Sequence, residues 1–293
     1  MAQECDVVAL GATVQRLGKD FVWPGGKRVA VIFNIAYEGW SDGKTPGIGP
    51  MGNPLPSGTL DTNALSWAAY GPNRGIQRLT EALAVHDIKA SVMVNGVIAE
   101  RHPETVGKLV AKGHEVLAHS YAMDIVPTML SEELERDNIE RTTAIVSKAA
   151  GVKLAGWISP RGTPSRNTAR MVAEAGYIWH GDAYDDDLPY IQHFAGSRIV
   201  AIPLTMEVND MPLYVRYGNA PSVFLDIFKD NLRRALEREK NALTIDVTAH
   251  THVFGRLSGA WVYEACAEIA KANSDVWICT RGQIAEHVLA QPS

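Results

Sequence analysis

Apolar runs alternate along the chain with segments of helical periodicity, and most of the runs stop at polar residues that are capable of chemistry. The runs that predict strands cover residues 28–34, 89–94, 115–118, 154–158, 177–179, 199–204, 243–249 and 275–279. The polar residues that follow them are Glu38, Asn95, His119, Ser159 with Arg161, His180 with Asp182, Thr205 with Glu207, His250 with His252, and Thr280 with Arg281. In a (β/α) barrel the carboxyl ends of all strands converge on one face, so these residues could share one pocket.

The segments between the runs carry helix starts and stops. Pro103 can occupy the first turn of a helix that Gly113 ends, Ser131 can cap a second, and Pro221 with Ser222 can open a third. Strand and helix therefore alternate, which predicts mostly parallel pairing, closed as a barrel or left open as a doubly wound sheet. No Gly-x-Gly-x-x-Gly follows the first run, which argues against a dinucleotide-binding fold.

Residues 39–66 interrupt the alternation with closely spaced glycine and proline. A long, stiff loop inside a compact domain is typical of a lid or a binding loop, and an arm for subunit contact is the alternative. The chain shows no internal repeat and no linker. We therefore expect residues 1–293 to form a single α/β domain with a loop or arm at 39–66.

Composition limits the partners. With 293 residues and a hydrophobic share of 46%, the chain can bury a large core. The net charge of -5, with no basic run, argues against nucleic acid. Neither a charged leader before an apolar stretch nor an apolar run of about 20 residues is evident, so we expect a cytoplasmic protein without a membrane partner.

The cysteines do not suggest a site. Cys5, Cys266 and Cys279 are an odd number and have no Cys-x-x-Cys spacing, which argues against a disulfide framework or structural zinc. Cys266 falls in a helical pattern and Cys279 in a strand, where cysteine acts as a small hydrophobe. A catalytic thiolate is disfavoured because no basic neighbour is visible locally.

Three of the polar positions have more than one possible use. Glu38 could bind a metal, act as a general base or hold the following loop. His119, on a loop after a buried strand, is a site candidate, although backbone groups could equally satisfy it. Arg161 lies between Pro160 and Pro164, where its guanidinium could bind a carboxylate or a polarised carbonyl, or form a structural ion pair.

Two further segments add candidates. Residues 182–187 carry four carboxylates in six positions, too many to be buried together in ionised form, so we expect one of them, Asp182, to face the site. His250 and His252 follow the run 243–249. We favour His250 as the catalytic member because it lies closest to the strand.

Together these residues resemble the polysaccharide-deacetylase-like (NodB-homology) superfamily over about residues 21–289. The resemblance implies a distorted (β/α) barrel similar to a TIM barrel. In the deacetylases of that superfamily the first strand ends in two aspartates, and a His-x-x-x-His motif completes the metal site. The corresponding positions here read Tyr37-Glu38 and His119-Ser-Tyr-Ala-Met123, so the second histidine is missing.

The departures look like those of the branch that contains metal-independent allantoinases and cyclic imide hydrolases. The similar motifs are Trp-Pro-Gly-Gly-Lys before the first strand, Asp182-Ala-Tyr-x-Asp-Asp-Leu-Pro-Tyr, and His250-x-x-x-x-Gly-Arg; the loop from Glu38 to Lys44 and the length look most like the imide hydrolases. Glu38 and His119 alone are too few ligands for a usual catalytic zinc. We expect no required cofactor, and if zinc binds, Glu38, His119 and His250 are its expected ligands, with Asp182 as another possible third one.

The resemblance implies hydrolytic opening of a small cyclic imide, such as succinimide, maleimide or glutarimide, to the half-amide. Hydrolysis of allantoin or a hydantoin-type cyclic ureide is the first alternative, a metal-dependent N-deacetylase the second, and a non-catalytic binding protein the third. The expected catalytic residues are Glu38 and His250 near the water, His119 as hydrogen-bond donor or proton shuttle, and Arg161 and Asp182 for positioning.

The remaining expectations concern binding. The expected substrate-binding residues are Tyr37, Asn95, Ser159, Tyr184 and His252. The resemblance also implies a homo-oligomer, with a tetramer as the plausible form. Whether Trp40, Trp67, Trp157 or Trp179 lines the pocket stays open at this point, because an indole is more often packed in the core.

Overall fold

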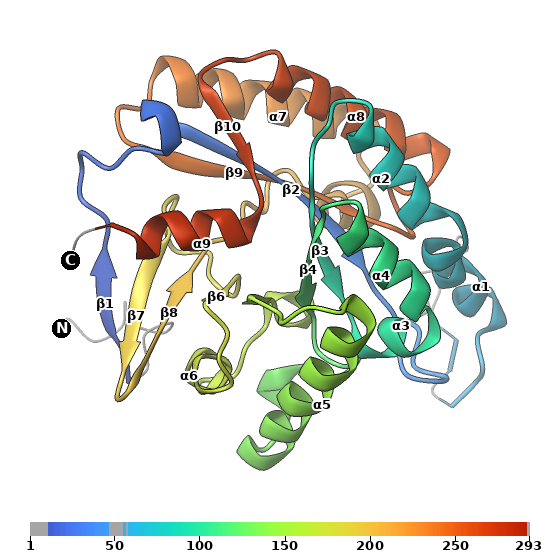
Figure 1. Cartoon of the computed structure of the whole chain (residues 1–293). Helices are drawn as coiled ribbons and strands as arrows, with labels where there is room; N and C mark the ends of the chain where they lie inside the picture. Colours follow the sequence, from blue (N-terminus) through green and yellow to red (C-terminus); the bar gives the residue numbers. More distant parts are fainter. Residues whose placement is uncertain (1–10, 47–54, 57, 292–293) are drawn as a thin grey trace.

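A strongly curved sheet with helices around its outside forms the body of the protein (Figure 1). The computed structural model describes residues 11–46, 55–56 and 58–291. The strands are β1 (Thr13–Arg16), β2 (Val29–Tyr37), β3 (Ser91–Val94), β4 (Glu115–Ala118), β5 (Gly156–Trp157), β6 (Trp179–His180), β7 (Tyr190–Phe194), β8 (Ser197–Ala201), β9 (Leu243–His250) and β10 (Val276–Cys279). The α-helices are α1 (Thr62–Tyr70), α2 (Ile76–Ala84), α3 (Gly96–Arg101), α4 (Pro103–Ala111), α5 (Glu132–Ala150), α6 (Thr168–Glu174), α7 (Pro221–Glu237), α8 (Leu257–Lys271) and α9 (Arg281–Leu289).

The strand order confirms the expected barrel-like α/β fold. The order is β1-β7-β8-β6-β5-β4-β3-β2-β10, and β9 also pairs with β2. All pairs are parallel except β1 with β7 and β7 with β8. In the part of the chain that the structure describes, no strand pairing joins β8 to β9, and the backbone N–H of Thr248 instead donates to the carbonyl of Val208 (2.9 Å). The barrel is therefore distorted between β8 and β9, and we call this gap in the strand pairing the seam.

The predicted strands and helix starts agree closely with the structure. Each of the eight predicted runs contains or overlaps a parallel strand, although β5 and β6 are only two residues long. The side chain of Ser131 accepts a hydrogen bond from the Leu134 N–H, as a cap should. Pro103 and Pro221 occupy the first turns of α4 and α7. The antiparallel strands β1 and β7 were not predicted.

The alternation of side chains along β2 decides what reaches the barrel interior. Phe33, Ile35 and Tyr37 pack in the large apolar cluster that includes helix residues such as Leu79. The alternate positions, including Ala36, belong to a second cluster with residues from other strands. Because successive strand side chains point to opposite faces, Asn34 and Glu38 share the inner face with Ala36.

The predicted loop 39–66 is shorter than expected, because α1 begins at Thr62 with Asp61 as its cap. Residues 47–54 and 57 lie outside the described residues. A π-helical turn, Gly71–Gly75, joins α1 to α2. A Cβ atom on Gly75 would lie 1.8 Å from the carbonyl oxygen of Thr251, so only glycine allows this segment to approach the turn after β9 so closely.

None of the helices in the described residues combines the length and the apolar character that crossing a membrane requires.

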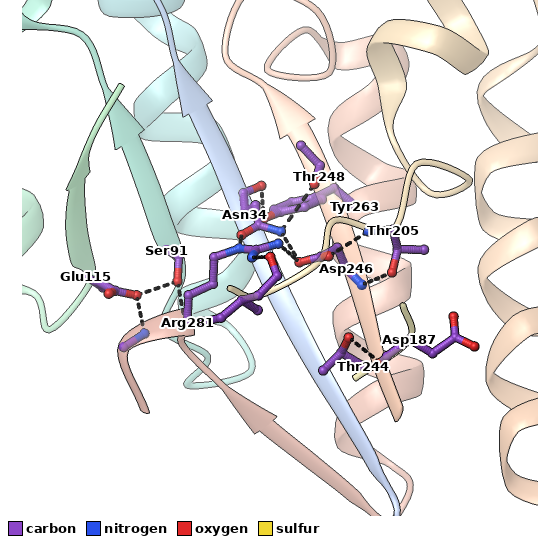
Figure 2. Close-up of polar contacts among 12 residues, drawn as sticks. Asn34, Ser91, Glu115, Asp187, Thr205, Thr244, Asp246, Thr248, Tyr263 and Arg281 are labelled. Atoms are coloured by element: carbon purple, nitrogen blue, oxygen red, sulfur yellow. Dashed lines mark hydrogen bonds and ion pairs between the residues drawn. The ribbon is translucent and has the colours of Figure 1, made fainter. Parts of the chain in front are cut away.

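A buried ion pair fills the inside of the barrel below the end of β2 (Figure 2). Nη2 of Arg281 donates to Oδ1 of Asp246 at 2.5 Å, and both side chains are fully buried. Nε of Arg281 donates to Asn34 (3.1 Å), and its Nη1 donates to the carbonyl of Ile202 (3.0 Å). Oδ2 of Asp246 accepts the Thr205 N–H (2.8 Å), which ties β9 to the segment after β8. The network therefore closes the seam that strand pairing leaves open.

Replacing Arg281 with methionine is expected to lower the free energy of unfolding by about 3–5 kcal/mol, because Asp246 would stay buried without its cation. Urea unfolding at neutral pH measures the effect. The double variant with Asp246→Leu is expected to recover part of the loss, since no unpaired charge remains. A loss below about 1 kcal/mol in Arg281→Met would contradict the assigned role of this ion pair.

Candidate active site

Three imidazoles converge on the carboxylate of Glu38, which lies just past the end of β2 and is 4% exposed. Oε1 of Glu38 lies 3.4 Å from Nε2 of His250 and 3.5 Å from Nε2 of His119. Oε2 lies 4.0 Å from Nε2 of His252. The parallel sheet thus brings together three candidates from β2, β4 and β9, together with His252, as the sequence predicts.

Asp210 orients His250 from the other side. Oδ1 of Asp210 accepts a hydrogen bond from Nδ1 of His250 at 2.5 Å. Oδ2 of the same carboxylate accepts the backbone N–H groups of His250 (2.8 Å) and Phe254 (3.1 Å). Asp210 is fully buried, so both of its oxygens are fixed. The imidazole is held with Nδ1 protonated and Nε2 directed at Glu38.

Asp210, His250 and Glu38 form a row in which the negative carboxylates and the positive imidazole stabilise one another's charged forms. Burial opposes the charged form of His250, but the carboxylates of Glu38 and Asp210 raise its pKa to about 10. Burial also opposes ionisation of Glu38, yet the charge of His250 and hydrogen bonds from His119 and His250 hold the pKa of its carboxyl well below the ordinary value. Near neutral pH the site therefore holds a carboxylate beside an imidazolium.

His119 is fixed by the backbone of the neighbouring strand segment. Its Nδ1 donates to the carbonyl of Ile158 at 2.6 Å, since a carbonyl only accepts. The side-chain amide of Asn95 donates to the carbonyl of His119, and its oxygen accepts the Gly39 N–H (2.9 Å). The other ring nitrogen of His119, Nε2, faces Oε1 of Glu38 at 3.5 Å, where it could serve as a hydrogen-bond donor or a proton shuttle.

His252 differs from the other two imidazoles. It is fully buried, and neither of its ring nitrogens has a hydrogen-bond partner among the described residues. The indoles of Trp40 and Trp67 meet its ring edge to face, with centroids 5.3 and 4.7 Å away. Burial lowers the pKa of His252 to about 3, so the ring is neutral. Trp40 and Trp67 therefore belong to the site, whereas Trp157 and Trp179 lie in the core.

Asp182 and Ser159 form a supporting pair next to His119. Oδ1 of Asp182 accepts the Ser159 N–H (2.7 Å), and Oδ2 accepts the Ser159 hydroxyl (2.6 Å). Burial raises the pKa of Asp182, and these hydrogen bonds oppose the rise. Ser159 follows Ile158, whose carbonyl holds His119. The pair thus positions the strand end that anchors His119, and no direct contact of Asp182 with Glu38 is found among the described residues.

The structure does not bring three of the expected residues into this cluster. Tyr37 is buried on the outer face of β2, because it is one residue away from Glu38 along a strand. Arg161 is exposed, with a positive φ of 61°. Tyr184 is 46% exposed and packs at Gly162, whose added Cβ would lie 1.7 Å from the tyrosine oxygen. Within the described part of the chain, neither Arg161 nor Tyr184 forms a hydrogen bond or ion pair with the three imidazoles.

Asp210 was missed by the sequence reasoning, which followed residues that come directly after apolar runs. It lies beyond Thr205 and Glu207, nine residues past the end of β8. The available signal was an aspartate two residues before Pro212, the pattern of a helix start, and a π-helical turn does begin at Met211. The two described cysteines, Cys266 and Cys279, are buried, and burial raises the pKa of both thiols.

The donor set does not fit a catalytic metal. Across residues 11–46, 55–56 and 58–291, no group of three His, Cys, Asp or Glu side chains is arranged to hold a metal ion. A catalytic zinc ordinarily takes three protein ligands and a water. Met123 occupies the position of the superfamily's second histidine, so one expected ligand is missing.

Comparisons with known proteins agree with this fold. The family model described as "Polysaccharide deacetylase" matches residues 68–179. The crystal structure of PuuE allantoinase is 26% identical, with 99% of each chain covered and a TM-score of 0.85. A "probable Polysaccharide deacetylase" from Pseudomonas aeruginosa PAO1 is 27% identical, covering 90% of this chain and 92% of that one, with a TM-score of 0.81.

A more distant curated relative is the peptidoglycan deacetylase of Helicobacter pylori (strain ATCC 700392 / 26695), which is 20% identical, with 77% of this chain and 87% of the relative covered. The fold, and the sequence of residues 68–179, are therefore similar to those of the polysaccharide deacetylase superfamily.

Proposed function

We propose that the protein hydrolyses a C–N bond in a small cyclic amide whose ring nitrogen lies between two carbonyl groups. The observation that carries the proposal is the row Asp210, His250 and Glu38, in which a proton donor and a carboxylate base lie 3.4 Å apart. Hydrolysis of such a ring needs a base for the water and an acid for the departing nitrogen. The carbonyl groups of an imide unit are more electrophilic than that of an ordinary amide, which reduces the need for a metal.

The proposed proton transfers balance within the row. Glu38 removes a proton from the attacking water while His250 donates the proton on Nε2 to the ring nitrogen that leaves. The C–N bond breaks, and a carboxylic acid and an amide form at the two ends of the opened ring. Glu38 can then return its proton to Nε2 of His250 across the same 3.4 Å, which restores both groups.

Two ring classes contain this unit, and different observations support them. The similarity to PuuE allantoinase over 99% of both chains supports a cyclic ureide of the allantoin type. The loop from Glu38 to Lys44 and the length of the chain look most like the cyclic imide hydrolases, which supports succinimide, maleimide or glutarimide. The indoles of Trp40 and Trp67 beside His252 supply apolar surface, which suits a small ring without a polar tail.

Ring opening followed by proton NMR tests the proposal. Purified protein is given succinimide or allantoin, in one sample after stripping with a strong chelator and in another with added zinc. We expect equal turnover in both samples, because the donor set does not fit a metal. The faster substrate identifies the ring class.

Three results would contradict parts of this proposal. Turnover only with zinc would restore a metal site that includes Glu38 and His119. Release of acetate from N-acetyl sugars, without ring opening, would favour a deacetylase. No reaction with any of these compounds would overturn the proposed function and favour a binding role.

A further inference from the structure

Two of the three imidazoles around Glu38 have a fixed tautomer, and the third does not. Nδ1 of His119 is bonded to the Ile158 carbonyl, and Nδ1 of His250 is bonded to Asp210. His252 has no partner at Nδ1 or at Nε2 among the described residues, and it is fully buried. Burial of a polar group without a partner is destabilising, so such groups in native proteins need an explanation.

The position of His252 is itself tightly fixed. Its carbonyl accepts a hydrogen bond from Nε of Arg256 (3.1 Å), and Nη2 of Arg256 also donates to the carbonyl of Trp67 (3.3 Å). The guanidinium lies over the ring of Tyr70, 4.0 Å from its centroid. One arginine thus ties the backbones of His252 and Trp67 together. The imidazole itself is fully buried and packs against the indoles of Trp40 and Trp67, so its missing partner cannot be explained by a loose side chain.

The orientation of the imidazole points to the reacting atoms. Nε2 of His252 faces Oε2 of Glu38 at 4.0 Å, too far for a hydrogen bond. The rings of His250 and His252 are 5.8 Å apart and nearly perpendicular. A ring nitrogen that receives a proton from His250 would therefore lie within reach of His252 as well.

We propose that His252 recognises the substrate by accepting a hydrogen bond from the N–H of its ring, with the indoles of Trp40 and Trp67 beside that ring. This inference rests on the proposed function and identifies the ring N–H as the substrate group that the site recognises. When the N–H is bound to His252, the lone pair of the same nitrogen is turned away and faces the proton on His250. The class of substrate is then a cyclic amide with an unsubstituted ring nitrogen.

The test compares succinimide with N-methylsuccinimide, which lacks the N–H. The value of kcat/KM is measured for both with the wild type and with His252→Phe, and the competitive inhibition constant of the methylated ring is measured as well. For the wild type we expect a preference for succinimide of about 10- to 100-fold. In His252→Phe we expect succinimide to lose about that factor, mainly through KM, while N-methylsuccinimide changes by less than about threefold.

Two control variants keep the test decisive. His252→Gln retains a hydrogen-bond acceptor and is expected to retain part of the preference for succinimide. His193→Phe removes a histidine of β7 that is hydrogen-bonded to Gln15 of β1. This variant is expected to change kcat/KM for neither substrate. Equal losses on both substrates in His252→Phe, or no preference in the wild type, would overturn the inference. Failure of the wild type to open any ring would instead overturn the proposed function.

Discussion

Replacing Glu38 with glutamine is expected to lower kcat by about 10²–10⁴-fold, with a much smaller change in KM. Glutamine fills the same space beside Nε2 of His250 and Nε2 of His119, but it cannot take a proton from water. A well-placed base typically contributes a factor of this size to the chemical step. Steady-state ring opening on the faster of succinimide and allantoin measures the loss.

Glu135→Gln is the matched control for this variant. Glu135 is 1% exposed and lies in α5, where it accepts hydrogen bonds from Ser165 and Thr168. This change is expected to leave kcat unaltered and to reduce stability only. A Glu38→Gln enzyme with near-wild-type turnover would remove this carboxylate from the mechanism and leave His119 as the remaining base beside the water.

Replacing Asp210 with asparagine is expected to lower kcat by up to about 10⁴-fold, the factor known for a carboxylate that orients a catalytic imidazole. It should also move the alkaline limit of activity to lower pH. The wild type needs an ionised Glu38 and a protonated His250. Because the pKa of His250 is raised to about 10, activity should be flat from mildly acidic pH to about 9 and should fall near 10. Without the charge of Asp210 that pKa falls, and so does the limit.

The pH dependence of stability gives a second readout of the same contact. The folded pKa of His250 lies above its ordinary value of 6.5, so its contribution to stability is fully present below about 6.5 and is lost as pH rises through about 10. In Asp210→Asn the alkaline loss of stability should begin at a lower pH. Profiles of kcat/KM and of melting temperature that keep the wild-type alkaline limit would refute the role given to Asp210.

The chemistry-bearing strand ends were the most predictable part of the site. Glu38, His119 and His250 follow apolar runs that pair in parallel, and parallel pairing brings such ends to one face whatever their separation along the chain. The same rule does not predict to which face of the sheet a side chain points, or where along the barrel axis a strand ends. Tyr37 faces outward although it is next to Glu38. Arg281 lies lower in the barrel because β10 pairs with only the first part of β2.

Other features depend on contacts that no local pattern carries. Asp210 reaches His250 from a segment outside the main strands, across the seam between β8 and β9. The helical start at Thr62 was hidden within a run rich in glycine and proline, although Asp61 caps it. β7 begins at Tyr190, after the acidic stretch 182–187, and it is defined by antiparallel pairing with β1 and β8. These positions are set by tertiary packing.

The glycine contact between the π-helical turn and the turn after β9 has a consequence for the geometry of the site. Backbone meets backbone where Gly75 and Gly255 each approach the carbonyl of Thr251. Trp67 lies in α1, which runs directly into the π-helical turn, and His252 lies in the turn after β9. If the proposed function holds, a ring meets Trp67 and His252 in one fixed relative arrangement, and little conformational entropy of these two residues is lost when it binds.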